Sequence, residues 1–513
     1  ALSPSTTGRV ILLASVFVVA ACGLAYELVA GAVSSYLMGD AVTQFSLVIG
    51  VFLSSMGLGS FLAKFVRRRL LHTFVHLEIW IGLLGGLSSI AMMAAYALVP
   101  ELFVPFFYLL CASIGALVGV EIPLLVRIVR SGGGISEALS HVLALDYLGA
   151  LAGAVLFPLV ALPHLGLSRA SVVFGILNLA VAVVGVGLLR GSRRGLLLGL
   201  AASWVVLVAA LVTSGRLVGF LEDLIYQDSV IFARDTAYQR IVLTRWRDDV
   251  RLYLNGHIQL SSVDEHRYHE PLVIPAMELV RRPRRVLVLG GGDGMAVREV
   301  LKYPGVEAVT LVDIDPVMTE LARTRPVLSR LNRGSLDDPR VEVVNTDAMR
   351  FLAEDDRLWD VILCDLPDPS SASLAKLYSR AFYGLALRRL AAGAALATHA
   401  TSPFYAREAF WCIVTTLEGA GSGEAGTPTL EVTPYHAHVP SFGEWGFALA
   451  TFEAVSIEGL EPSVPTRFLD ADALAAMAAF GRDIERPAGV EVNRLDDPVL
   501  FRYYQQGWRT YNE

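Results

Sequence analysis

Apolar residues run almost without interruption through the first 215 positions, and this pattern predicts a helical membrane domain. Seven stretches approach or exceed the roughly 20 residues that a helix needs to cross a bilayer. Because a helix satisfies its own backbone hydrogen bonds, we expect these stretches to form a polytopic α-helical bundle. The seven predicted spans are 10–38, 42–63, 74–99, 103–126, 140–163, 170–189 and 195–214. Small residues four apart, Gly115 with Gly119 and Gly149 with Gly153, predict close helix contacts.

Polar and apolar residues begin to alternate after a linker that we place at Ser214-Gly215-Arg216. Residues 238–244 and 250–254 show the period of two that is typical of strands. Asn255-Gly256 is a strong signal for a two-residue hairpin turn. The sequence therefore predicts a small antiparallel β domain over residues 216–262.

Short apolar strands then alternate with helices, which predicts a parallel sheet covered on both faces, in an α/β Rossmann-like domain of the methyltransferase type over residues 263–464. Its most informative stretch is the strand 285–289, which runs into the glycine turn 290–294. Such a turn lets the backbone approach a nucleotide, although a purely structural turn is the alternative. Residues 465–513 contain no motif, and we expect a helical tail packed on the domain or on the membrane face.

Acidic residues stand at the predicted carboxyl ends of these strands, where an open α/β sheet binds its ligands. Five like charges in one crevice repel one another unless the ligand is cationic. The pattern therefore favours a sulfonium nucleoside that bears an amine but no carboxylate, together with an amine acceptor. The five acids are Asp293, Asp313, Asp347, Asp365 and Asp368.

The loop Asp365-Leu366-Pro367-Asp368-Pro369 places two carboxylates three residues apart on a proline-stiffened segment. An amine with a pKa near ~10 must lose a proton before it attacks carbon, and a carboxylate within hydrogen-bond distance can accept that proton. Asp365 is the better candidate for the base because it ends a strand. A helix cap or an Asx turn is the alternative interpretation.

Several separated motifs together resemble the spermidine synthases, the polyamine aminopropyltransferases. They are 264–265 with 268–270, the glycine turn 290–294, the segment 312–315 and the loop 365–369. The resemblance spans roughly residues 225–452, and the N-terminal half resembles the membrane-bound branch of that family. It implies transfer of an aminopropyl group from decarboxylated S-adenosylmethionine to a diamine such as putrescine, with release of methylthioadenosine.

The resemblance also implies roles for individual residues. The resemblance implies an enzyme that needs no metal and no cofactor, since decarboxylated S-adenosylmethionine is a cosubstrate. It also implies a possible homodimer. For His269 alone, a surface histidine at a helix start is the alternative. The implied roles are Asp365 as proton acceptor, Asp368 as its partner for the amines, Asp293 and His269 for the diamine, Gln227 for the sulfonium cosubstrate, Asp313 for ribose and Asp347 for adenine, with Tyr268, Gly290 and Gly292 also substrate-binding.

Two departures from the family pattern leave the identity of the acceptor open. Residues 370–373 replace a Gly-Pro-Ala-like stretch, and residues 438–445 stand where a Pro-Ser-Gly segment with a tyrosine is common. His436 and His438 either contact an amine or alternate along a strand, and the spacing favours the strand.

Composition narrows the classes of partner. Hydrophobic residues make up 54% of the chain and charged residues 18%, with a mean hydropathy of +0.53. The net charge of -7 and the lack of a long basic run exclude nucleic acid as an expected partner. The four cysteines predict neither a zinc site nor a disulfide framework. No cleavage site follows the first apolar stretch, so we expect a span and not a removed signal peptide.

Four acids lie within or near the predicted spans, where an unpaired charge is costly. One interpretation is a cation or polyamine site, and the other is carboxyls that hold helices together. The first supports a second functional hypothesis, a polyamine transporter or sensor whose soluble domain only binds nucleoside and amine. A methyltransferase of similar fold is a third. The four acids are Glu27, Glu78, Glu121 and Asp146.

Basic residues follow the second, fourth and sixth predicted spans, which places those loops in the cytosol. With seven spans, the catalytic half would then face outside, whereas the supply of substrate favours the cytoplasm. A re-entrant segment or an unrecognised eighth span would reconcile the two arguments. The basic residues are Lys64, Arg67, Arg68 and Arg69, then Arg127 and Arg130, then Arg190, Arg193 and Arg194.

Overall fold

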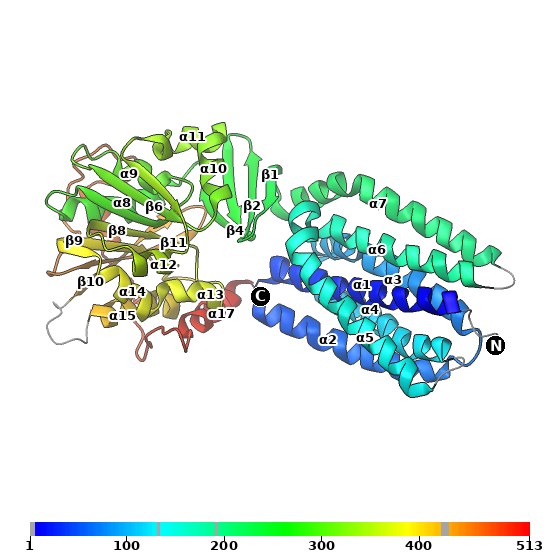
Figure 1. Ribbon diagram of the computed structural model, residues 1–513. Coiled ribbons are helices and arrows are strands. Elements are labelled where there is room, and N and C mark those ends of the chain that lie inside the picture. The colour runs from blue at the N-terminus through cyan, green and yellow to red at the C-terminus, as the bar shows by residue number, and fades with distance from the viewer. Residues whose placement is uncertain (1–5, 40, 131–133, 190–192, 422–429, 513) are drawn as a thin grey trace. The chain divides into compact units, whose positions relative to one another are not determined.

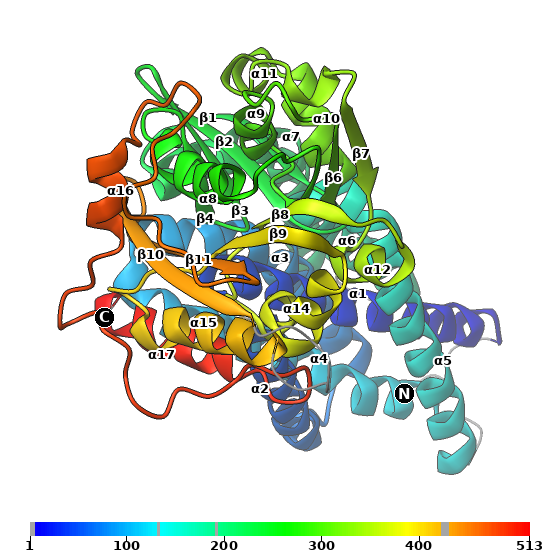
Figure 2. The same ribbon diagram turned by 90° about the vertical axis from the view of Figure 1, so that its left-hand side faces the viewer.

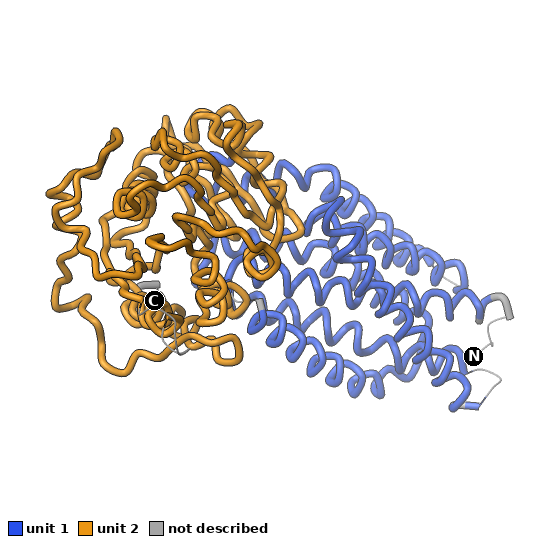
Figure 3. Tube along the Cα trace, turned by 60° about the vertical axis from the view of Figure 1, so that its left-hand side comes forward, with its two compact units in different colours: residues 1–230 blue, residues 231–513 orange. Residues whose placement is uncertain are grey.

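The computed structural model describes residues 6–39, 41–130, 134–189, 193–421 and 430–512. The chain divides into two compact units, residues 1–230 and 231–513, which Figure 3 colours separately. Arg190, which contributes to the predicted orientation, lies outside the described residues.

Long apolar helices build the first unit (Figure 1). Within the described part, six helical runs are long and apolar enough to cross a membrane. One of them, 136–188, contains 53 residues and includes non-helical backbone at Gly166 (φ 73°, ψ 171°). It contains α5, a π-helical turn at Phe157–Ala161 and α6, and both helices pack against α1. The helices are α1 (Thr6–Met38), α2 (Ala41–Leu62), α3 (Leu70–Leu98), α4 (Pro100–Val129), α5 (Ile135–Leu156), α6 (Leu162–Leu188) and α7 (Arg194–Tyr226).

Glycines bring these helices into close contact, as the four-residue spacing predicted. A Cβ at Gly119 would lie 2.1 Å from the carbonyl oxygen of Met56, and one at Gly149 would lie 2.2 Å from that of Phe17. Helix α4 therefore touches α2, and α5 touches α1, with no room for a larger side chain.

The predicted linker at Ser214-Gly215-Arg216 is wrong, because α7 continues through it to Tyr226 and the boundary between the units falls after Val230. One glycine costs a helix only about 1 kcal/mol, so flanking residues that favour the helix override it. The hydroxyl of Ser214 also bonds inside the helix, to the carbonyl oxygen of Leu211 at 2.9 Å.

The predicted small antiparallel sheet opens the second unit, in the order β1-β2-β3-β4. The turn between β3 and β4 is formed by Asn255 (φ 51°) and Gly256 (φ 85°), the left-handed pair that a two-residue hairpin requires. The strands are β1 (Ser229–Asp235), β2 (Arg240–Trp246), β3 (Asp249–Leu254) and β4 (His257–Ser261).

A seven-stranded sheet forms the rest of this unit, in the order β10-β11-β9-β8-β5-β6-β7. Strands β9, β8, β5, β6 and β7 are parallel, while β11 and β10 complete one edge antiparallel. The predicted Rossmann-like domain is therefore confirmed. The strands are β5 (Arg285–Gly290), β6 (Ala308–Asp313), β7 (Val341–Asn345), β8 (Trp359–Asp365), β9 (Leu390–His399), β10 (Glu431–Val439) and β11 (Gly443–Thr451).

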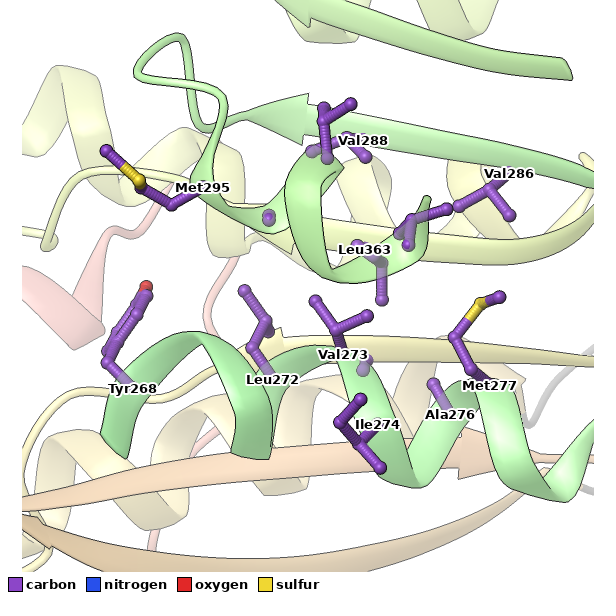
Figure 4. Close-up of a cluster of buried hydrophobic side chains, with 14 of the residues drawn as sticks. Tyr268, Leu272, Val273, Ile274, Ala276, Met277, Val286, Val288, Met295 and Leu363 are labelled. Carbon is purple, nitrogen blue, oxygen red and sulfur yellow. The ribbon is translucent and has the colours of Figure 1, made fainter. Parts of the chain in front are cut away.

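Alternate residues of the sheet enter two separate cores. Val286 and Val288 of β5 pack on one side against helices that include α8, whose inward side chains Figure 4 shows. Leu287 and Leu289 pack on the other side with α12, α14 and α15. Because both faces are covered, these strands are continuous apolar runs. The helices are α8 (His266–Leu279), α9 (Met295–Val300), α10 (Pro316–Thr324), α11 (Pro326–Leu331), α12 (Ala348–Glu354), α13 (Ala372–Ala375), α14 (Arg380–Leu387) and α15 (Arg407–Gly421).

The tail of residues 465–513 packs on this domain, which was one of the two predicted placements. They contain only two helices in the described part, α16 (Ala471–Met477) and α17 (Val499–Asn512), and are otherwise irregular. Leu474 enters the first core and Leu500 the second. Helix α17 lies along α15, as Figure 2 shows.

Candidate active site

A cavity of about 330 Å³ lies at the carboxyl ends of β5, β6 and β8, the edge where this fold binds ligands. Every residue around it belongs to the second unit. The predicted residues that line it are Tyr268, His269, Gly290, Gly292, Asp293, Asp313, Asp347, Asp365 and Asp368. The structure thus brings together all five strand-end acids, which the sequence scatters over 76 positions.

The glycine turn after β5 forms one wall of the cavity, and steric crowding explains its composition. Gly290 has φ +82°, and a Cβ there would lie 1.9 Å from the carbonyl oxygen of Asp365 on the neighbouring strand. A Cβ at Gly292 would lie 2.5 Å from Oδ2 of Asp313. Only glycine fits at these two positions, so the turn brings bare backbone to the cavity.

Asp313 ends β6 and is held by backbone donors. Its Oδ2 accepts from the amide of Gly292 at 3.0 Å, and its Oδ1 accepts from the amide of Asp315 at 2.8 Å. Burial raises the pKa of Asp313 to about 6, although these two hydrogen bonds lower it. The carboxylate is therefore fixed between the glycine turn and the start of α10, and its predicted role in binding ribose stays a prediction.

Asp347 lies further along the same edge and caps α12. Its Oδ1 accepts from the amides of Met349 and Arg350, and its Oδ2 pairs with Nζ of Lys376 at 2.8 Å. Burial raises the pKa of Asp347, but the hydrogen bond from Lys376 and the cap outweigh it, so the pKa is lowered. Asp347 is thus a carboxylate at neutral pH, and Lys376 is a cation of the cavity that the sequence analysis did not identify.

Asp365 ends β8 with one oxygen occupied and one free of protein partners. The hydroxyl of Tyr268 donates to Oδ1 at 2.8 Å, whereas Oδ2 is buried without a hydrogen-bond partner in the described structure. Burial and then the charge of Asp293 raise the pKa of Asp365 to about 6, while His269 and Tyr268 lower it. A carboxylate with this pKa is ionised at neutral pH and accepts a proton more readily than a surface aspartate.

Asp368 presents a similar pair of oxygens three residues later. Oδ2 accepts from the hydroxyl of Tyr504 at 3.1 Å, and Oδ1 is buried without a hydrogen-bond partner among the described residues. Burial raises the pKa of Asp368 to about 7, and the hydroxyls of Tyr504 and then of Thr401 lower it. Asp365 and Asp368 therefore line one cavity, each with an unoccupied acceptor oxygen.

His269 lines the cavity near Asp293 and Asp365 and is buried and not at the surface, which excludes its alternative interpretation as a surface histidine. Its Nδ1 contacts Oε2 of Glu265 at 2.9 Å, and Glu265 is also held by Arg298 at 2.8 Å. Burial lowers the pKa of His269, but Glu265 raises it to about 9. His269 is therefore a cation at neutral pH, and its charge stabilises the nearby carboxylate of Asp365. The same positive charge makes His269 less suitable for binding a protonated amine.

Aromatic rings form the apolar wall of the cavity. Phe442 lies with its ring centroid 5.9 Å from that of Tyr268 and 5.2 Å from that of Trp445. The imidazole of His399 stacks on Trp445 with centroids 6.3 Å apart. This wall suits the methylene groups of an alkyl amine, whose nitrogen the carboxylates attract.

Several cavity residues were missed by sequence reasoning, and one predicted residue lies elsewhere. Gln227 directly follows α7 in the first unit and is not among the residues that line the cavity, so its role stays a prediction. The dipeptide Tyr-Gln occurs again at 238–239, and Gln239 does line the cavity. The repeated dipeptide was the available signal. Other missed lining residues are Gln259, Lys376, His399, Phe442 and Trp445.

The two histidines of β10 have structural partners. His436 pairs with Glu444 through Nδ1 and contacts the carbonyl oxygen of Ala479 through Nε2 at 2.9 Å. His438 lies 3.5 Å from the same glutamate. Neither lines the cavity, so the strand interpretation is confirmed.

A glycine turn and a cluster of carboxylates at the edge of this sheet define the class: a Rossmann-like transferase domain for a nucleoside and a cationic partner. A family model, "Spermine/spermidine synthase domain", matches residues 265–456. Polyamine aminopropyltransferase 1 of Ralstonia nicotianae is 46% identical over 98% of this chain and 96% of its own length. The polyamine aminopropyltransferase of Leptospira interrogans is 44% identical over 96% of this chain and 98% of its own. The chain belongs to the polyamine aminopropyltransferase family, that of the spermidine synthases.

Among solved structures, the chain is similar to a spermidine synthase in complex with the transition-state analogue AdoDATO. It is 26% identical, with a TM-score of 0.44, over 49% of this chain and 85% of that one.

Proposed function

We propose that this protein transfers the aminopropyl group of decarboxylated S-adenosylmethionine to a primary amine of a diamine such as putrescine. The observation that carries this proposal is the pair Asp365 and Asp368. Each places a buried carboxylate at the cavity that the glycine turn also lines, and each has one oxygen without a hydrogen-bond partner among the described residues. Membership of the family supports the same chemistry.

The reaction is a direct displacement in which every electron pair is accounted for. The amine nitrogen forms a bond to the propyl carbon next to sulfur, the carbon–sulfur bond breaks, and its electron pair returns to sulfur as the neutral thioether methylthioadenosine. The proton that leaves the nitrogen goes to Oδ2 of Asp365. The donor is consumed as a substrate, and the protein contributes orientation and proton removal.

Charge selects the donor nucleoside. Decarboxylated S-adenosylmethionine carries a sulfonium and an ammonium group, which the five carboxylates of the cavity attract. S-adenosylmethionine has an additional carboxylate, which these acids repel. We expect at least tenfold weaker binding of S-adenosylmethionine in a direct comparison on the purified protein, and equal affinities would favour the methyltransferase hypothesis.

The experiment that tests the function uses detergent-solubilised protein with decarboxylated S-adenosylmethionine and a panel of diamines. Wild type should release methylthioadenosine and a longer polyamine. Asp365→Asn should lower kcat by roughly 10²- to 10⁴-fold, the range for general base catalysis. Asp356→Asn is the matched control because Asp356 is exposed and pairs only at the surface with Arg389. Tight nucleoside binding without product for any amine would contradict the proposal.

We also propose that the first unit is a multi-pass membrane domain of seven spans, with the 53-residue run crossing twice. A straight helix of that length would measure about 80 Å, far more than a bilayer core of about 30 Å, and Gly166 interrupts it. Labelling of a cysteine introduced at exposed Asp356 with an impermeant thiol reagent, in intact and opened cells, tests the side of the catalytic unit. The four native cysteines are buried, which keeps the background low.

A second candidate activity, transport of an amine or another cation, is favoured by a buried pair in the first unit. Glu78 and Glu121 are in direct contact, and Asn178 donates to Oε2 of Glu78 at 2.9 Å. Each glutamate has one buried oxygen without a partner in the part of the chain that is described. In proteoliposomes, Glu78→Gln with Glu121→Gln should abolish polyamine flux and spare turnover. Equal flux in wild type and variant would exclude it.

A further inference from the structure

The C-terminal helix α17 reaches the amine side of the cavity from a segment beyond the family-matched residues 265–456. We propose that Tyr504 of this helix is a positioning residue that holds the carboxylate of Asp368 for the acceptor amine. This inference rests on the proposed function and adds to it a part of the chain to which the sequence assigned no role.

The contact is specific and buried. The hydroxyl of Tyr504 donates to Oδ2 of Asp368 at 3.1 Å, and Tyr504 is only 8% exposed. Oδ1 of the same carboxylate has no hydrogen-bond partner in the described structure, while Asp368 lines the cavity. Tyr504 is not among the lining residues, so it acts through Asp368 and does not touch the substrate. One oxygen is thereby fixed and the other left for a ligand.

Helix α17 is anchored firmly enough to position a side chain. A Cβ at Gly507 would lie 2.6 Å from Cα of Ala406, so backbone packs closely against backbone there. The ring of Trp508 stacks on Tyr405 with centroids 4.9 Å apart. Leu500 is completely buried in the core that contains α15. The position of Tyr504 is therefore set by packing on three sides.

A second tie joins the tail to the segment that follows the catalytic loop. Nδ2 of Asn493 donates to the carbonyl oxygen of Ala375 at 2.8 Å, and its Oδ1 accepts from the amide of Leu500 at 3.4 Å. The buried Asn493 thus links α13 to the start of α17. The tail holds the loop 365–369 from its far side through Tyr504 and holds the next helix through Asn493.

The surroundings of Asp368 explain why this donor matters. Nδ1 of His399 lies 3.9 Å from Oδ1, and Tyr268 and Tyr378 are close enough to interact electrostatically with this carboxylate, although their hydroxyls bond to other groups. Burial lowers the pKa of His399 to about 4, so it brings no positive charge at neutral pH. The hydrogen bond from Tyr504 lowers the pKa of Asp368 against the effect of burial. Without it, Asp368 is protonated more often and attracts an ammonium group less.

The test compares Tyr504→Phe with Tyr503→Phe in the full-length detergent-solubilised protein. Tyr503 is adjacent in sequence, and its hydroxyl lies 3.5 Å from Glu491 at the surface, so the control removes the same atom elsewhere. In Tyr504→Phe we expect KM for the diamine to rise about tenfold, as for loss of a hydrogen bond to a charged group. KM for the nucleoside should stay within twofold, and the acid limb of kcat/KM for the diamine should move to higher pH.

Tyr503→Phe should match wild type in all three quantities. An unchanged diamine KM and pH profile in Tyr504→Phe would overturn the proposal, as would equal rises of both KM values, which would indicate a general structural defect. Thermal unfolding and nucleoside binding of each variant identify such a defect independently. If wild type itself releases no methylthioadenosine, the proposed function fails. If wild type is active and Tyr504→Phe equals it, only this inference fails.

Discussion

The phenolic hydroxyl of Tyr268 donates to Oδ1 of Asp365 at 2.8 Å, from a tyrosine on α8 to an aspartate 97 positions later at the end of β8. This bond orients the carboxylate, because it occupies one oxygen and leaves Oδ2 for the proton transfer that we propose. It also opposes the rise that burial causes in the pKa of Asp365.

Tyr268→Phe should therefore raise the pKa of Asp365 above about 6. Loss of a hydrogen bond to a charged group is worth about 1.5 kcal/mol, or roughly one pH unit. We expect the acid limb of the kcat profile to shift upward by about one unit, with the largest loss of rate below pH 7. A uniform loss at all pH values would contradict this role and indicate an effect on packing alone.

Gly290→Ala should destabilise the second unit and abolish activity. The left-handed backbone costs an L-residue about 1–2 kcal/mol, and the new Cβ would lie 1.9 Å from a backbone carbonyl oxygen. Thermal unfolding should occur at least about 4 °C lower than in wild type. Gly384→Ala is the matched control: a Cβ there meets nothing within 4 Å, and alanine favours the helix α14 by about 1 kcal/mol. Equal behaviour of the two variants would exclude the steric argument.

Asp313→Asn should weaken the donor nucleoside selectively. Both carboxylate oxygens accept from backbone amides, and an asparagine can accept through only one. We expect KM for decarboxylated S-adenosylmethionine to rise more than about tenfold while KM for the diamine changes less than twofold. Steady-state kinetics with each substrate varied in turn provides the measurement. A change confined to the diamine would refute the assignment of Asp313 to the nucleoside.

The buried pair His269 and Glu265 should make the stability of the second unit depend on pH. The pKa of His269 is raised to about 9 in the folded state, so its stabilising effect is complete below the unfolded value near ~6.5 and is lost as pH rises through 9. The pKa of Glu265 is lowered, so its contribution is present above ~4.3 and is lost in acid. Both contributions are complete between about pH 4.5 and 6.5.

Unfolding temperature measured from pH 6 to pH 9.5 should fall, by an amount that corresponds to at most about 3 kcal/mol. His269→Gln should remove most of this slope, at the cost of a lower stability at pH 6. His257→Gln is a useful control because His257 is a histidine of the small β sheet with a lowered pKa. A slope that persists in His269→Gln would show that another group titrates.

The sequence was most informative where chemistry and periodicity coincide. Asp313 and Asp365 were identified because each ends a predicted strand. Parallel strands bring their carboxyl ends to one edge of the sheet, whatever the conformation of the loops. Contacts that depend on packing between distant segments were not predictable in this way. Tyr504 lies 136 positions from Asp368, and no periodicity relates them. Lys376 begins a short 3-10 helical turn directly after α13, and only the folded chain places its ammonium group on Asp347.

The boundary between the units was misplaced for a related reason. Ser214-Gly215-Arg216 has the composition of a linker, but these three residues are helical because the helix continues on both sides of them. Gln227 was assigned from its resemblance to a family motif, and the same Tyr-Gln pair at 238–239, which lines the cavity, was interpreted only as part of a strand.

The course of α7 determines where the catalytic unit can be separated from the rest of the chain. A polypeptide that starts at residue 217 would carry ten residues of severed helix, including the apolar side chains of Leu217, Phe220 and Leu224, which are 38–58% exposed. These residues would make such a fragment bind detergent micelles and self-associate. A fragment that starts at Asp228, just before β1, keeps the small sheet intact and omits that surface. For crystallisation or inhibitor screening, moving the cloning boundary by these eleven residues removes an apolar surface that favours aggregation.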